Sequence, residues 1–288
     1  MLEEPQETTL NNDTKNTIVC STTGELLMPV RLYYKIHNKH LLIKTLNRLK
    51  SVEFEQGGKS FIISYYKEAK NLGLEVHYQE VPEELYPVTL AHGYIKQGSS
   101  LHIDLKSLRR ATGIIDFLSK HIPSSIIEIT DLASVNKLTT TNDQSLEDVM
   151  EQDYDKLFDE NTMSYIDSLD SSDMKEVYED EQAYHAEEKW SRFESYIKTR
   201  ELEAYPEVEK ISIDYSRKNH EHLITQLTVR SVIKEAMAME HHNGNKNYSS
   251  MDVIKELVTM LTNNMRQDLS DELEHLKQSK QSLPKWNK

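Results

Sequence analysis

The residues with the most distinctive chemistry lie between Leu26 and Val52, a stretch with lysine, arginine and histidine but no aspartate or glutamate. Lysine and arginine neutralise phosphates, and tyrosine rings stack on bases. A second basic group opens a segment with helical spacing, where cations oppose the helix dipole. The pattern predicts a surface for nucleic acid or another polyanion. Its candidate residues are Arg31, Tyr33, Tyr34, Lys35, Lys39, Lys44, Arg48, Arg109 and Arg110.

The alternative interpretation of this stretch is an ordinary solvated face, balanced by nearby carboxylates such as Glu53, Glu55 and Glu68. Runs of charge without a recognised motif are most often solvated faces. The positive stretch alone therefore does not decide between the two interpretations.

The excess negative charge lies elsewhere in the chain. The protein has 288 residues and a formal charge of −14, and residues 146–190 account for −13 of it. Such a segment can engage a basic partner, cover the chain's own basic residues, or serve as a hydrated linker. Bulky apolar and aromatic side chains occur between the acidic residues, which favours a segment that docks on a surface. They are Tyr154, Phe158, Tyr165, Ile166 and Leu169.

Sequence motifs for catalysis or metal binding are missing. The chain has no Walker A loop, Gly-x-Gly-x-x-Gly, Gly-x-Ser-x-Gly or His-Glu-x-x-His. Glu272-x-x-His275 has the spacing of a di-iron helix but occurs once. Cys20 is the single cysteine, which excludes an internal disulfide and a thiolate zinc cage. We expect no metal and no cofactor.

The same sequence predicts a cytoplasmic protein without membrane contact. The acidic start, residues 1–15, lacks the apolar core of a signal peptide. No apolar run approaches the roughly 18 residues that a transmembrane helix needs.

The elements that must position these residues mix two periodicities in the first half of the chain. The turn pair Gly57-Gly58 predicts a hairpin between two strand-like segments. An irregular mixture of strands and helices predicts an α+β domain with a mixed or antiparallel sheet and about three helices. The strand-like runs are Leu27–Ile36, Ser51–Glu55, Leu74–Glu80, Pro87–Ile95, Leu101–Leu105 and Ser124–Thr130. The helical runs are Lys39–Lys50, Tyr65–Leu72 and Lys106–His121.

The second half reads as an all-α region of long amphipathic helices. Apolar stripes follow Ser171–Leu202 and His220–Met239, and Ser249 or Ser250 caps a final helix. Single stripes must be buried against each other, the first domain or a partner. The predicted organisation is a disordered tail (1–15), an α+β domain (16–138), an acidic polar connector (139–170) and a helical region (171–288). Candidate partner-interface residues are Trp190, Phe193, Ile197, Leu261 and Met265.

Together these features favour a non-enzymatic cytoplasmic binding or regulatory protein. Its basic face would contact nucleic acid or another polyanion, and its acidic helical half would contact a protein or mask that face. One alternative is a protein–protein adaptor or homodimer built on the C-terminal helices, with no nucleic-acid role. A second is a hydrolase or nuclease whose carboxylates and histidines meet only in the fold.

Overall fold

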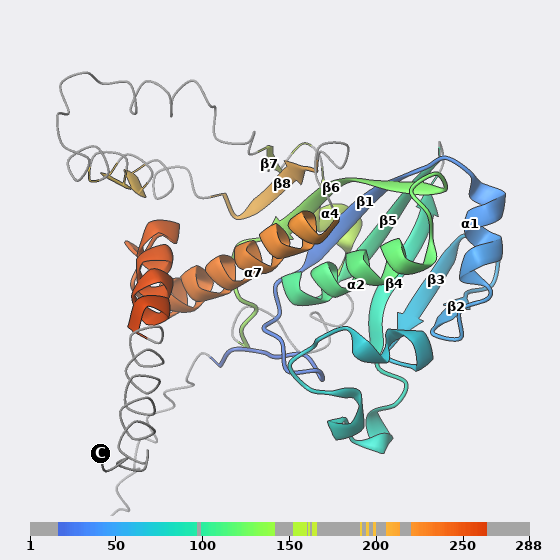
Figure 1. Cartoon of the computed structure of the whole chain (residues 1–288), viewed down its shortest axis with the longest axis horizontal. Helices are drawn as coiled ribbons and strands as arrows, with labels where there is room; N and C mark the ends of the chain where they lie inside the picture. The colour runs from blue at the N-terminus through green and yellow to red at the C-terminus, as the bar shows by residue number, and fades with distance from the viewer. Residues whose placement is uncertain are drawn as a thin grey trace, which may run out of the picture. The chain divides into compact units, whose positions relative to one another are not determined.

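The computed structural model describes residues 17–96, 99–141, 152–159, 161, 163–165, 191, 194, 195, 198, 199, 206–213 and 220–263 (Figure 1). The chain divides into two compact units, Met1–Met163 and Ser164–Lys288. The predicted tail and most of the predicted helix Ser171–Leu202 lie outside the described residues. Part of the predicted connector, residues 152–159, belongs to the first unit.

The first unit is built on an antiparallel sheet with strand order β2-β3-β4-β5-β1-β6. Alternate side chains face opposite sides of such a sheet. Leu32 and Ile103 are opposite each other and fully buried on one face, whereas Arg31 and Asp104 face the other. The strands are β1 (Val30–Ile36), β2 (Val52–Phe54), β3 (Ser60–Ser64), β4 (Thr89–Lys96), β5 (Ser100–Leu105) and β6 (Ile127–Val135).

Two helices flank this sheet. Helix α1 (Lys39–Leu46) follows β1 and begins where the Asn38 side chain accepts a hydrogen bond from the Leu41 amide. Helix α2 (Leu108–His121) lies across the apolar face of the sheet and contacts β1, β4 and β5 (Figure 1). Its cap is Ser107, whose hydroxyl accepts from the amide of Arg110. The predicted stripe of α2 is buried, as expected.

The predicted strand Leu74–Glu80 and helix Tyr65–Leu72 are wrong in detail. The first is irregular and ends in a short 3-10 turn, η2 (Tyr78–Glu80). Its backbone is bonded to the Thr23 carbonyl and the Tyr65 hydroxyl instead of a neighbouring strand. The second is a 3-10 turn, η1 (Lys67–Asn71), and a third such turn is η3 (Glu83–Leu85). The hairpin at Gly57-Gly58 is confirmed, because β2 and β3 pair on either side of it.

In the second unit, β7 (Ser164–Tyr165) pairs in parallel with β8 (Val208–Ser212). Helix α7 (His220–His242) follows, and Gly244 in the turn after it has a φ of +96°. A further helix covers residues 250–263. The described part of this unit is thus not helical throughout, because the alternating Val-Glu-Lys-Ile-Ser segment forms a strand.

Candidate functional site

A group of exposed cations lies on α1 and at its two ends. Leu42 and Leu46 anchor the helix in the core, which directs the rest of its circumference toward solvent. No ion pair joins these cations to any residue within the described ranges. The residues are Lys35, Lys39, Lys44, Arg48 and Lys50, and we refer to them as the α1 basic surface.

Several cations elsewhere in the first unit pair with carboxylates. Lys96 contacts Asp155 at 2.8 Å, Lys120 contacts Asp116 at 2.5 Å, and Arg109 contacts Glu75. Exposed cations such as Lys59 and Lys67 also lack a described ion-pair partner. The α1 basic surface differs from them because five such cations are grouped on one helix and its flanks.

Carboxylates near the α1 basic surface bind other groups. Glu128 contacts the His37 ring at 3.1 Å. Glu68 accepts a hydrogen bond from the Ser51 amide at 3.1 Å. Although burial raises the pKa of Glu68, hydrogen bonds from the backbone of Glu68, Lys50 and Ser51 lower it overall. Glu68 thus stays ionised while it caps the turn that carries Lys50.

An exposed aromatic ring lies on a segment whose backbone is hydrogen-bonded next to Lys50. Tyr66 is 40% exposed, and its amide bonds to the Ser64 carbonyl at 2.7 Å. The Ser64 amide in turn bonds to the carbonyl of Ser51, the neighbour of Lys50, at 2.8 Å. The Lys67 ammonium lies 5.0 Å from the Tyr66 ring centroid. Sequence reasoning missed Tyr66, although it adjoins a lysine just as the chosen tyrosines do.

The predicted contact Arg31 is a buried structural residue. Its side chain is 4% exposed, and its Nε and Nη2 donate to the two Asp104 oxygens at 2.5 and 2.8 Å. Its Nη1 donates to Asp155 at 2.7 Å. A charge this deeply buried needs counter-charges, and two carboxylates of the same unit supply them. Arg31 therefore does not offer its charge to a polyanion, and the prediction that it is an exposed contact is wrong.

The predicted stacking residues Tyr33 and Tyr34 are also inside the fold. They are 8% and 5% exposed. Tyr33 packs edge-on against the His102 ring, with centroids 4.8 Å apart. Neither ring can receive a base without a rearrangement of the sheet.

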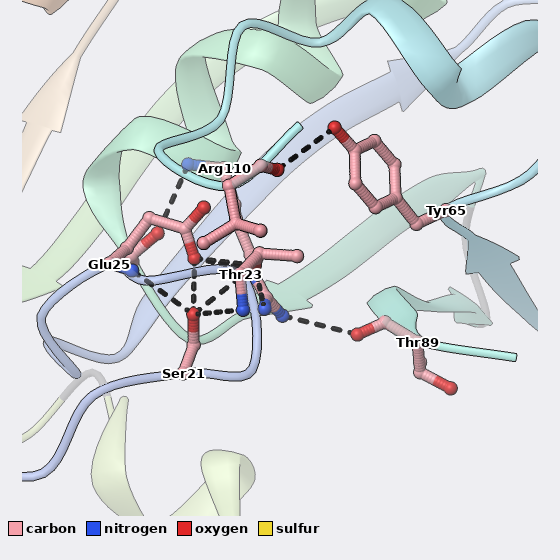
Figure 2. A network of polar contacts seen from close by, with 8 residues as sticks. Ser21, Thr23, Glu25, Tyr65, Thr89 and Arg110 are labelled. Carbon is pink, nitrogen blue, oxygen red and sulfur yellow. Dashed lines mark hydrogen bonds and ion pairs between the residues drawn. The ribbon is translucent and has the colours of Figure 1, made fainter. Parts of the chain in front are cut away.

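Arg110 lies in a polar network at the other end of β1 (Figure 2). It is 2% exposed, and its nitrogens donate to Glu25 at 3.2 Å, Thr23 at 2.5 Å and the Thr89 carbonyl at 3.1 Å. Burial lowers the pKa of Arg110, and the charge of Glu25 opposes that effect. This network ties the loop before β1 to α2 and β4.

Arg109 and Arg110 lie far from α1. Leu105, just before α2, is opposite Val30 at the start of β1, whereas α1 follows the end of β1. The structure therefore does not bring them together with the α1 basic surface. Of the predicted contacts, Lys35, Lys39, Lys44 and Arg48 remain.

The predicted partner interface is described at one position. Leu261 is 59% exposed on the helix at 250–263, and Val258 and Met260 on that helix are also exposed. Trp190, Phe193, Ile197 and Met265 lie outside the described residues.

The described residues contain neither a group of side chains arranged for a metal ion nor a helix suited to cross a membrane. Among them, no group of three or more His, Cys, Asp or Glu side chains is arranged to hold a metal ion. Within the same ranges, no helix combines the length and apolar character required to cross a membrane. Cys20 is exposed as a free thiol.

Comparison with known proteins yields no relative. No family model matches the chain, and neither a curated protein nor a solved structure matches it. Function must therefore be argued from the surfaces themselves.

Proposed function

We propose that this protein is a non-enzymatic cytoplasmic binding protein whose α1 basic surface contacts nucleic acid or another polyanion. The observation that carries the proposal is the grouping of five exposed cations without a described ion-pair partner on one helix and its flanks, whereas Lys96, Arg109 and Lys120 are paired. Such cations release condensed counterions when they neutralise phosphates. Tyr66 and Lys67 follow Ser64, whose amide is bonded to the neighbour of Lys50, and they supply a ring for stacking on a base and a further cation.

The first experiment is fluorescence-anisotropy binding of the full chain to labelled single-stranded DNA, duplex DNA and RNA at low and moderate salt. The test variant is K39E/K44E, which reverses two charges of the α1 basic surface. The control is K59E/K246E, which reverses two other exposed lysines and changes the net charge equally. We expect the test variant to bind more weakly and its salt slope to fall by about two, whereas the control keeps the slope.

Absence of binding at low salt, or an equal loss in both variants, would refute the phosphate-contact proposal. A preference for single strands that Tyr66→Ala removes would assign base stacking to that ring. In that variant the salt slope should not change, because the ring carries no charge.

A second candidate function is a protein–protein adaptor that acts through the helix at 250–263. The observation in its favour is the exposure of Val258, Met260 and Leu261 at 52% or more. Apolar side chains grouped on a helix are typical of an interaction face. Size-exclusion chromatography with light scattering tests this, because an assembly that Leu261→Glu disrupts and Thr259→Glu keeps would favour the adaptor.

A further inference from the structure

The polar face of the sheet carries a short segment from the acidic part of the chain. This segment is α4 (Tyr154–Leu157), followed by the buried Phe158. Arg31 on β1 is opposite Asp104 on β5, and Lys96 near the end of β4 is on the same face. The face thus presents a charged pair and a lysine to α4.

One carboxylate of α4 accepts hydrogen bonds from this face through both of its oxygens. Asp155 Oδ1 accepts from Arg31 at 2.7 Å, and Oδ2 accepts from Lys96 at 2.8 Å. Asp155 is itself 63% exposed, whereas the Arg31 side chain is 4% exposed. A buried guanidinium therefore directs one nitrogen outward at a carboxylate on the surface.

Two neighbouring rings of the same segment lie near the guanidinium. Its Cζ lies 6.0 Å from the Tyr154 centroid and 5.8 Å from the Phe158 centroid. Arginine favours such contacts with aromatic faces. The Tyr154 hydroxyl also donates to the Leu105 carbonyl at 2.8 Å. Charge, ring and backbone contacts thus converge on one short segment.

The segment cannot hold its shape without these contacts. A four-residue helix is far below the length that is stable alone in water. Its local support is limited to the Asp153 side chain, which accepts from the amides of Asp155 and Lys156, and to two backbone hydrogen bonds, from Leu157 to Asp153 and from Phe158 to Tyr154. The conformation and position of α4 therefore depend on its contacts with the sheet, as those of a bound peptide depend on contacts with its receptor.

We infer that the polar face of β1, β4 and β5 is a binding site for acidic–aromatic peptide segments of the pattern Tyr-Asp-x-x-Phe, which residues 154–158 occupy in cis. A partner segment of this pattern takes the site by displacing α4. This site is separate from the α1 basic surface and does not rest on the proposed function.

A peptide suits the site better than a phosphate chain does. Two nitrogens of Arg31 are committed to Asp104, so one is left for the ligand. The Leu105 carbonyl accepts a hydrogen bond, which a phosphate oxygen cannot donate. The two rings add apolar surface that a polyanion lacks.

The experiment measures binding of a fluorescent peptide with the sequence of residues 152–159 to the full chain. Asp155→Lys in the protein opens the site, because it places a cation against Arg31 and Lys96. We expect the peptide to bind this variant roughly tenfold or more tightly than it binds wild type, since the competitor in cis is weakened. The control peptide has the same composition in scrambled order.

Substitutions in the peptide and the protein then test the proposed contacts. With the opened variant, a peptide with Asn in place of the central Asp should bind roughly tenfold more weakly, because it loses charge-assisted bonds. Adding Lys96→Glu to the opened variant should restore the contact in cis and abolish peptide binding. Peptide binding no tighter than the scrambled control, or binding of single-stranded DNA instead, would overturn the inference.

A second measurement covers the case in which the opened variant unfolds. Amide hydrogen exchange of wild-type protein compares Leu157 and Phe158 with the strand amides of β1 and β5. A displaceable α4 exchanges through local opening, roughly tenfold or more faster than the strands. Equal exchange of α4 and the strands would show α4 to be a fixed layer of the fold, which contradicts the inference.

Discussion

Arg31 on β1 and Asp104 on β5 are opposite each other in the strand register and share two hydrogen bonds, at 2.5 and 2.8 Å. Both side chains are almost fully buried. Burial raises the pKa of Asp104, and the charge and hydrogen bonds of Arg31 oppose that effect. The pair therefore fixes the polar face of the sheet at the cost of burying two charges.

Replacing Arg31 with methionine should strongly destabilise the first unit. The change leaves the Asp104 carboxylate buried without its main partner, and breaking such a pair costs about 3–5 kcal/mol. The control Lys35→Met removes an exposed cation from the same strand and should change stability by about 0.5 kcal/mol or less. Denaturant unfolding of the two variants measures the difference. A cost for R31M equal to that of K35M would contradict the assigned role.

Gly93 should not tolerate a side chain, because the Phe61 ring lies over it across β3 and β4. A Cβ at position 93 would meet Phe61 Cζ at 2.2 Å. Gly93→Ala should therefore cost about 1–3 kcal/mol through overpacking. Thermal unfolding of G93A, F61L and the double variant tests this. The double variant should be more stable than the sum of the single effects predicts, and strict additivity would rule out the ring contact.

Sequence patterns predicted the elements whose signal is local. The 3.6-residue stripe of α2, from Ala111 to Leu118, is buried in the structure. The strand-like runs Leu27–Ile36 and Leu101–Leu105 correspond to β1 and β5. The sequence also predicted exposed cations on α1, and Lys39 and Lys44 are exposed in the structure. Local periodicity reports which side of an element is apolar.

The burial of the polar residues could not be predicted from the sequence, because it depends on partners that are far away along the chain. Arg31 and its partner Asp155 are separated by 124 positions, and Arg110 and Glu25 by 85. In sequence, Arg31, Tyr33 and Lys35 alternate as one polar face of a strand. Whether such a face meets water depends on what covers it, and here α4 covers Arg31 but leaves Lys35 exposed.

Glu209 should stabilise the second unit. Its carboxylate is buried and contacts both Arg230 and Lys234. Burial raises the pKa of Glu209, but these two cations lower it overall. Glu209→Gln should cost about 3–5 kcal/mol, because the two cations lose that carboxylate. Denaturant unfolding measures this cost. The control is Glu207→Gln at an exposed glutamate two residues earlier, which should cost about 0.5 kcal/mol or less.

Docking of α4 should weaken in acid. The hydrogen bond from Lys96 lowers the pKa of Asp155; burial opposes this, and Arg31 lowers it further. A carboxylate with a lowered pKa in the folded state adds stability that is fully present above its unfolded value, about 3.9. That stability is lost as the pH falls through the lower folded value, where Asp155 takes up a proton and releases the two cations.

The measurement is the fluorescence of an environment-sensitive dye attached to a cysteine at Lys156, in a chain whose Cys20 is replaced by serine. We expect the signal of docked α4 to stay constant from neutral pH to about pH 4 and to change below it. Asp155→Asn serves as the control, because it lacks the titrating group and should show no transition of its own in that range. A transition of equal midpoint and size in both proteins would assign the acid response to other carboxylates and remove Asp155 as the contact that holds α4.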